Sequence, residues 1–246
     1  MSRICTHKSS VDFEEPALVE GFPGVGLVGK IATDHLIDQL EMDYYASVHC
    51  EGLPRIGIYR RGDGVIRPPV RLYVSEEANL FALQSDVPIG SQAVKTVAEC
   101  LTGWILEHDA TPLYLSGLPT DWDDRPDVFG VATGDGIEQL EANGIDFPPE
   151  DGAVSGPTGA LLNRAAELEV DSLGLVVECS PQFPDPKAAS VLIEETIAPI
   201  ADIDVNVEDL IDRAAEIRQQ REAFARRMRE MGEAESTQAQ PLRMYQ

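Results

Sequence analysis

The chain has 246 residues, of which 43% are hydrophobic and 25% charged, a balance that excludes global disorder and allows one large domain or two small ones. Its 43 acidic residues outnumber 19 lysines and arginines, and the resulting net charge of −24 argues against nucleic acid or anionic membranes as partners. No apolar run reaches the roughly 18 residues of a membrane span, and the first residues lack a secretory apolar stretch, so we expect a cytoplasmic protein.

The basic residues indicate the kind of surface the protein has, and the cysteines indicate their own burial and redox state. Only four basic residues are lysines, and an acidic, lysine-poor surface resembles that of proteins from salt-loving microbes, where molar salt screens self-repulsion. The four cysteines stand far apart and form no CxxC pair. Three of them, Cys50, Cys100 and Cys179, lie within or beside apolar runs, so we expect buried, reduced thiols.

Strand-like and helix-like segments alternate over residues 1–207, which predicts one α/β domain with helices packed on a central sheet. The predicted strands are residues 17–22, 44–50, 79–84, 111–116, 128–133 and 172–177, and the predicted helices are residues 25–40, 88–107, 135–143, 158–168 and 185–200. Residues 56–59 and 65–74 flank a glycine-containing turn, which predicts a hairpin. Pro68 and Pro69 indicate that its second arm is an edge strand or contains a bulge.

Residues 208–231 predict one long helix after a break in composition. Its apolar positions alternate by four and three residues in a coiled-coil-like stripe: Leu210, Ala214, Ile217, Phe224, Met228 and Met231. We expect this stripe to help hold a homo-oligomer, with packing on its own domain as the alternative. Residues 232–246 have no apolar period and predict a flexible tail.

The most conspicuous motif is the glycine run at residues 21–29. Gly24, Gly26 and Gly29 form a GxGxxG pattern after a predicted strand and at the start of a helix, the context of a dinucleotide-binding loop. A nucleotide-binding or phosphorolytic enzyme is therefore one interpretation. The other is that the glycines permit a tight turn and close contact between helix and strand. Pro23 interrupts the junction, which favours the second.

Two weaker motifs have structural explanations. Ser155-Gly156-Pro157-Thr158-Gly159 opens another predicted helix, where free amides could hold an anion, although capping of the helix by Ser155 or Thr158 is the favoured explanation. The acidic loop at residues 121–124 lacks the regular ligand spacing of a calcium site. No HExxH, GxSxG or P-loop pattern occurs, so we expect no catalytic site, resident cofactor or metal.

Four blocks in order resemble the conserved segments of the proteasome assembly chaperone family, in its archaeal and halophilic form: GFPGVGLVGKIATDHLI, RPDVFGVAT, SGPTGALLNRAA and PDPKAASVLIE. They extend from residue 21 to about residue 195. The resemblance implies an α/β domain with a mixed central sheet similar in outline to nucleoside phosphorylase-like folds. It also implies a non-catalytic, oligomeric chaperone that binds proteasome α subunits, with the glycine loop serving the fold.

The last three residues, Met244-Tyr245-Gln246, fit a hydrophobic–Tyr–any-residue ending. This ending resembles the tails with which proteasomal ATPases and assembly factors enter pockets between α subunits. A terminal carboxylate can pair with a lysine, Tyr245 offers rigid amphipathic contact and Met244 fills an adaptable apolar site. We therefore expect these three residues to be the partner-binding site.

Overall fold

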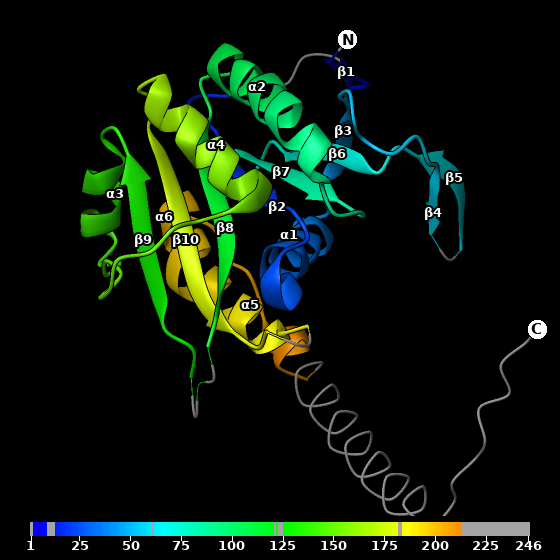
Figure 1. The fold of residues 1–246 in the computed structure, drawn as a ribbon. Helices are drawn as coiled ribbons and strands as arrows, with labels where there is room; N and C mark the ends of the chain where they lie inside the picture. The colour runs from blue at the N-terminus through cyan, green and yellow to red at the C-terminus, as the bar shows by residue number, and fades with distance from the viewer. Residues whose placement is uncertain are drawn as a thin grey trace, which may run out of the picture.

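The computed structural model describes residues 2–8, 13–60, 62–120, 122, 125–181 and 184–212. These residues form three layers, with helices on both faces of an eight-stranded mixed sheet (Figure 1). The predicted α/β class with a mixed central sheet is thereby confirmed. The division at residues 207 and 231, and the outline similarity to phosphorylases, stay predictions.

The sheet has the strand order β1–β3–β6–β7–β2–β8–β10–β9. Its strands are β1 (Arg3–Thr6), β2 (Ala17–Gly21), β3 (Asp43–His49), β6 (Val70–Ser75), β7 (Leu80–Ser85), β8 (Thr111–Pro119), β9 (Val128–Thr133) and β10 (Ser172–Cys179). The four central strands β7, β2, β8 and β10 run parallel, whereas every other pairing is antiparallel. Parallel strands covered on both faces consist of continuous apolar runs, which is why the sequence predicted these four.

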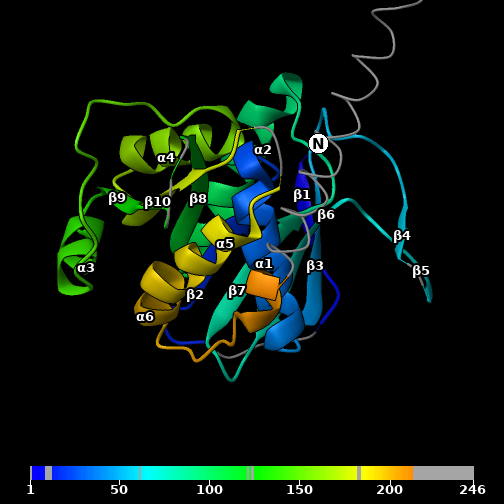
Figure 2. The same cartoon turned by 90° about the horizontal axis from the view of Figure 1, so that it is seen from below.

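Helices cover both faces of the sheet. On one face lie α2 (Ser91–Glu107) and α4 (Gly156–Glu167). On the other lie α1 (Val28–Gln39) and α5 (Pro186–Leu192), which contact each other, with α6 (Ala198–Ala201) after α5 (Figure 2). The short helix α3 (Gly136–Ala142) packs beside β9. None of the helices that the structure describes combines the length and apolar content needed to cross a bilayer.

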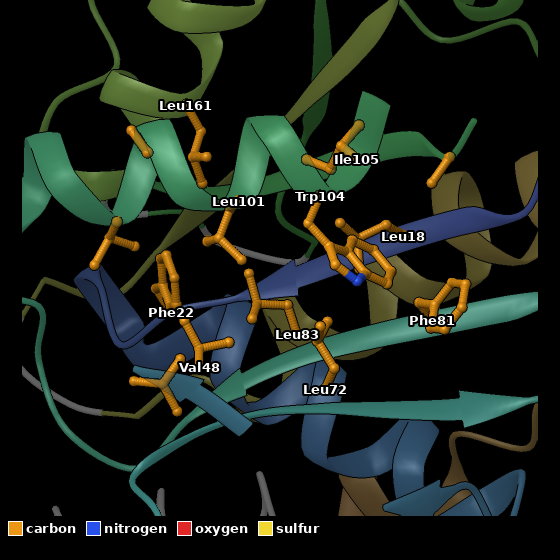
Figure 3. Close-up of a cluster of buried hydrophobic side chains, with 14 of the residues drawn as sticks. Leu18, Phe22, Val48, Leu72, Phe81, Leu83, Leu101, Trp104, Ile105 and Leu161 are labelled. Carbon is orange, nitrogen blue, oxygen red and sulfur yellow. The ribbon is translucent and has the colours of Figure 1, made fainter. Parts of the chain in front are cut away.

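An aromatic contact marks the core beneath α2 (Figure 3). Trp104 of α2 meets Phe81 of β7 edge to face, with ring centroids 4.9 Å apart. Leu101 of the same helix and Leu161 of α4 lie in the same cluster. A pair of this geometry contributes about 0.5–1.5 kcal/mol beyond its buried area, so it fixes the position of α2 over the sheet.

The chain divides at Pro68 and Pro69 where one strand was predicted. β5 (Asp63–Arg67) pairs with β4 (Ile58–Arg60) in a separate two-stranded sheet, and β6 begins after the prolines and lies between β3 and β7. The hairpin is therefore confirmed. The interpretation of the prolines as marking an edge strand holds for β5, which pairs on one side only, and is wrong for β6, which lies inside the main sheet. Proline lacks an N–H to donate, so the chain leaves one sheet there and enters another. The β4–β5 hairpin extends away from the main sheet (Figure 1).

Two further differences concern the ends of the chain. Strand β1 has only four residues and was not predicted, because four residues are too few to establish an alternation. At the other end, residues 208–212 are helical, and Leu210 is fully buried in the domain's own core. The first position of the apolar stripe thus packs on its own domain. Residues 213–246 lie outside the described part of the chain, so the rest of the helix and the tail stay predictions.

Arg71 of β6 is buried, with 1% of its side chain exposed. Its guanidinium donates to Tyr73 Oη at 3.0 Å and to the Pro68 carbonyl at 2.6 Å. It also donates to Gln84 and Asp86 at the end of β7. Gln84 in turn donates to Asp34 of α1, so one polar network joins α1 to two strands.

Replacing Arg71 with methionine should lower the free energy of unfolding by about 3–5 kcal/mol, because Gln84 and Asp86 would lose a buried cationic donor. Denaturant unfolding measures this change. Arg164→Met is the matched control, since the ion pair of Arg164 with Glu167 is partly exposed and its loss should cost less than about 1 kcal/mol. Equal losses in the two variants would contradict the importance of the Arg71 network.

Candidate functional site: the glycine junction

The carboxyl ends of β2, β8 and β10 meet the starts of α1, α4 and α5. In open α/β sheets, ligands bind in the crevice outside these strand ends. Both glycine-rich segments of the sequence lie here, since residues 21–29 join β2 to α1 and residues 155–159 begin α4. We call this region the glycine junction.

Gly21 and Gly26 occupy positions that exclude other residues. A Cβ atom at Gly21 would lie 2.1 Å from Thr33 Oγ1 and 2.7 Å from the Gly29 carbonyl oxygen, far inside contact distance. Gly26 has φ of +63°, and a Cβ there would lie 2.8 Å from Cys179 Sγ. The first glycine therefore allows α1 to approach β2, and the second allows the turn before α1 to press against β10.

The other two glycines of the motif differ. A Cβ at Gly29 would lie 3.2 Å from Leu115 Cβ, so this residue helps α1 to pack on β8. Gly24 makes no contact of this kind; its Cβ would meet only the Phe22 carbonyl oxygen, at 4.0 Å. Protein atoms also occupy the far side of the turn, because the Asp185 amide donates to the Gly26 carbonyl at 2.8 Å. Close packing thus accounts for Gly26 and Gly29, and a cofactor at Gly24, Gly26 and Gly29 stays an untested alternative.

Glu20 is the residue that sequence reasoning missed. It is the fourth residue of β2 and is fully buried. Its Oε1 accepts from the Phe22 amide at 2.6 Å, and its Oε2 accepts from Thr158 Oγ1 at 3.0 Å. This second bond joins β2 to α4. The sequence did contain a signal for this residue, namely a glutamate within an apolar predicted strand. A buried acid of this kind needs hydrogen-bond partners on other elements.

The predicted capping of α4 is wrong. Ser155 precedes the helix but its side chain accepts no capping hydrogen bond, and the hydroxyl of Thr158 is engaged by Glu20 instead. By contrast, α5 is capped by Asp185, whose carboxylate accepts from the amides of Ala188 at 3.1 Å and Ser180 at 2.9 Å. Asp185 therefore fastens the start of α5 to the end of β10.

Burial controls the protonation of the junction. It raises the pKa of Glu20 to about 7, and the hydrogen bonds from Phe22, Thr158 and Leu115 only partly oppose it. Burial, followed by the charge of Glu20, also raises the pKa of Tyr114. Within the described part of the chain, Tyr114 Oη and Thr33 Oγ1 have no hydrogen-bond partner. Glu20 thus stands among apolar and hydroxyl groups, and no ion pair with it is found among the described residues.

The cysteines agree with the prediction in part. All four are free thiols, and Cys50 and Cys179 are buried as expected, whereas Cys100 is half-buried. Burial, then the charge of Asp185, raises the pKa of Cys179 to about 12, so this thiol stays protonated beside Gly26. A protonated thiol is a poor nucleophile, and the arrangement offers packing rather than covalent chemistry.

The remaining candidate residues are only partly described. In the acidic loop, the Trp122 ring lies under the Lys187 ammonium group, with Nζ 4.9 Å from the ring centroid. Asp121, Asp123 and Asp124 lie outside the described residues. The predicted partner-binding residues, Met244, Tyr245 and Gln246, also lie outside them.

Comparisons with known proteins agree on one family. The model of the PAC2 family matches residues 18–225. An uncharacterised protein of Methanocaldococcus jannaschii is 28% identical over 228 residues, covering 92% of this chain and 89% of the relative. Among solved structures, Pyrococcus furiosus PbaA, described as an archaeal homologue of proteasome-assembly chaperone, has a TM-score of 0.80 and 25% identity over 96% of both chains. PbaB of the same organism, described as an archaeal proteasome activator, shares the fold with a TM-score of 0.78 and 22% identity over 91% of this chain and 98% of its own.

Glu20→Gln should remove a pH dependence of stability. The folded protein holds the Glu20 proton up to about pH 7, while the unfolded chain releases it near the ordinary value of 4.5. The stability from this protonated group is therefore fully present below pH 4.5 and is lost as the pH rises through 7. Between about pH 5 and about pH 8, the wild type should lose up to about 3 kcal/mol of unfolding free energy relative to the variant.

Denaturant unfolding at several pH values provides the measurement. Glu138→Gln removes an exposed carboxylate on α3 and should follow the wild-type pH dependence, which separates burial from a change in net charge. The idea fails if Glu20→Gln and Glu138→Gln show the same dependence on pH.

Proposed function

Since the chain belongs to the PAC2 family, we propose that it is a proteasome-binding protein of the assembly-chaperone kind rather than an enzyme. The observation that carries the proposal is the family match over residues 18–225. It is supported by PbaA, a relative similar over nearly its whole length that is described as a homologue of proteasome-assembly chaperone. The partners proposed are proteasome α subunits.

The packing of the glycine junction supports a binding protein over the alternative nucleotide-dependent enzyme. Gly26 and Gly29 are explained by contacts with Cys179 and Leu115, so two of the three glycines of the GxGxxG pattern need no ligand to account for them. The acid found nearby, Glu20, is fully buried and already bonded to Phe22 and Thr158. A general acid or base must reach the substrate, and this carboxyl is enclosed by protein.

We infer that the contact with the α subunits is made by Met244, Tyr245 and Gln246. The terminal carboxylate can pair with a lysine, and Tyr245 anchors the tail through its ring and hydroxyl. About 12 residues separate this ending from the predicted helix, and a flexible chain of that length has a root-mean-square reach of about 20 Å. A tail of this reach can enter a pocket while the domain stays outside it.

A homo-oligomer would carry several tails. When one tail binds, the others are held near their pockets at high effective concentration, so the overall affinity exceeds that of any single tail. The apolar positions of the predicted helix beyond residue 212, including Ile217 and Phe224, are proposed to contribute to this assembly. Leu210, which precedes them, packs within the domain.

Tyr245→Ala should weaken binding to a purified proteasome core at least tenfold per tail, because truncating an aromatic anchor typically costs about 2 kcal/mol or more. Several tails acting together compound the loss. One residue added after Gln246 should be almost as damaging, since it displaces the carboxylate and moves the tyrosine from its penultimate position. Surface-plasmon binding at low and at molar salt measures both variants.

Gln246→Ala is the control, because the pattern accepts any residue at the last position, and this variant should bind as the wild type does. Equal affinity of wild type, Tyr245→Ala and the extended chain would contradict tail docking and leave only contact through the domain. Failure of the wild type itself to bind α subunits would contradict the proposed function as a whole.

A further inference from the structure

The hairpin end of the molecule carries a basic groove on an acidic protein. A groove of about 870 Å³ lies between the end of β3 and the base of the β4–β5 hairpin. Arg3, Arg55, Arg67 and His49 line it, and Glu51 is the one acid among the lining residues. Arg67 is paired with Asp63, but Arg3 and Arg55 are exposed and make no ion pair with any described residue. We call this surface the arginine groove.

The positive charge of the groove comes from its arginines rather than from its histidine. Burial lowers the pKa of His49, and the charges of Arg3 and His7 lower it further. His49 is therefore neutral near pH 7, and the two arginines without an ion pair among the described residues, Arg3 and Arg55, outnumber Glu51. A positively charged groove favours the binding of an acidic segment. Such a local excess of positive charge is unusual on a chain whose net charge is −24.

The hairpin beside the groove exposes apolar side chains. Tyr59 is 76% exposed, Ile66 is 62% exposed and Val65 is 53% exposed. A two-stranded hairpin is marginally stable by itself, and a cluster of exposed apolar side chains on a highly charged protein indicates a contact surface. The partner should therefore offer an apolar side chain together with its acids.

The opposite end of the sheet offers that combination. The loop of residues 146–151, which follows α3, reads Asp-Phe-Pro-Pro-Glu-Asp. Phe147 is 47% exposed, and its flanking acids make no ion pair with any described residue. Two prolines stiffen the loop, and the Asp146 carbonyl accepts from the Gly130 amide at 2.8 Å, which fastens the loop to β9. Next to it lies a groove of about 430 Å³ lined by Asp127, Asp146 and Glu195.

We propose that the loop 146–151 of one copy of the chain docks into the arginine groove of a second copy, with Phe147 against the exposed face of the hairpin. The two surfaces lie at opposite ends of the molecule in both views, so one copy does not satisfy its own groove (Figures 1 and 2). Two copies meeting groove to groove would place arginine against arginine. A head-to-tail contact instead joins opposite charges, and where its rotation closes it produces a ring.

The proposed contact also offsets the electrostatic repulsion between acidic copies of the chain. Copies of net charge −24 repel one another, so association needs a place where that repulsion is reversed. The arginine groove is such a place. This inference does not depend on proteasome binding, since it concerns contacts between copies of this chain alone.

Charge reversal on each surface tests the contact. Arg55→Glu and Glu150→Arg should each lower the mass measured by light scattering below that of the wild type and weaken association at least tenfold. Mixing the two variants in equal amounts should raise the mass above that of either variant alone, and should restore the wild-type mass fully where the ring has an even number of subunits, because the two variants must alternate. In the mixture, Arg55 of one chain meets Glu150 of the other, and the reversed pair forms at the next contact. The double variant should also assemble by itself.

Lys95→Glu and Glu138→Arg are the controls, because they make the same charge changes at exposed positions outside both surfaces. Both should keep the wild-type mass. Phe147→Ala should weaken association at low and at molar salt, whereas the charge variants should differ most at low salt, where ions screen least. A monomeric wild type, an unchanged mass in Arg55→Glu, or a double variant that fails to assemble would overturn the proposal. Loss of assembly on changing Tyr59 but not Phe147 or Glu150 would show hairpin-to-hairpin contact and overturn it equally.

Discussion

The close approach of α1 to the end of β2 is the contact on which the three layers depend. Gly21 lies so near Thr33 that a side chain there would collide with it, and Gly26 takes a left-handed turn against Cys179. The start of α1 is thereby set against β8 and β10 as well as β2. The start of α5 is fastened to the same turn through the amide of Asp185 and the carbonyl of Gly26. The glycine run at residues 21–29 resembles a phosphate-binding loop in sequence. In this structure its glycines hold helices close to strands.

Glu20 adds a polar connection to this apolar centre. Its carboxyl holds the loop after β2 through Phe22 and holds α4 through Thr158, so one side chain links this loop to the helix. Burial of the group without an ion pair favours its protonated form. The arrangement differs from that of Arg71, where a buried charge is surrounded by carboxylate, amide and hydroxyl partners. Both residues specify which elements meet, because a misplaced partner would leave a polar group unsatisfied.

Charge is distributed unevenly over a chain that is strongly acidic as a whole. Six of the fifteen arginines fall between residues 213 and 229, outside the described part, and three more line one groove at the hairpin end. The loop 146–151 and the groove lined by Asp127, Asp146 and Glu195 lie at the other end of the sheet. These two surfaces are the basis of the contact proposed between copies of the chain. The chain belongs to the PAC2 family, and its fold is similar to that of PbaA.

The sequence by itself determined the α/β class, the positions of the central strands and most helices, because burial on both faces of a sheet or one face of a helix leaves a local pattern. Four motif blocks indicated the family, whereas the parallel direction of the central strands came from the tertiary structure. It left two explanations of Gly24, Gly26 and Gly29, and only the contacts of Gly26 and Gly29 favoured packing. The tertiary structure alone decided that residues 65–74 divide between two sheets, that Thr158 serves Glu20 rather than a helix cap, and that Arg71 is buried. It also placed the arginine groove and the loop 146–151 at opposite ends. Such features join residues far apart in the chain, as Glu20 and Thr158 are, and local periodicity carries no information about which distant elements become neighbours.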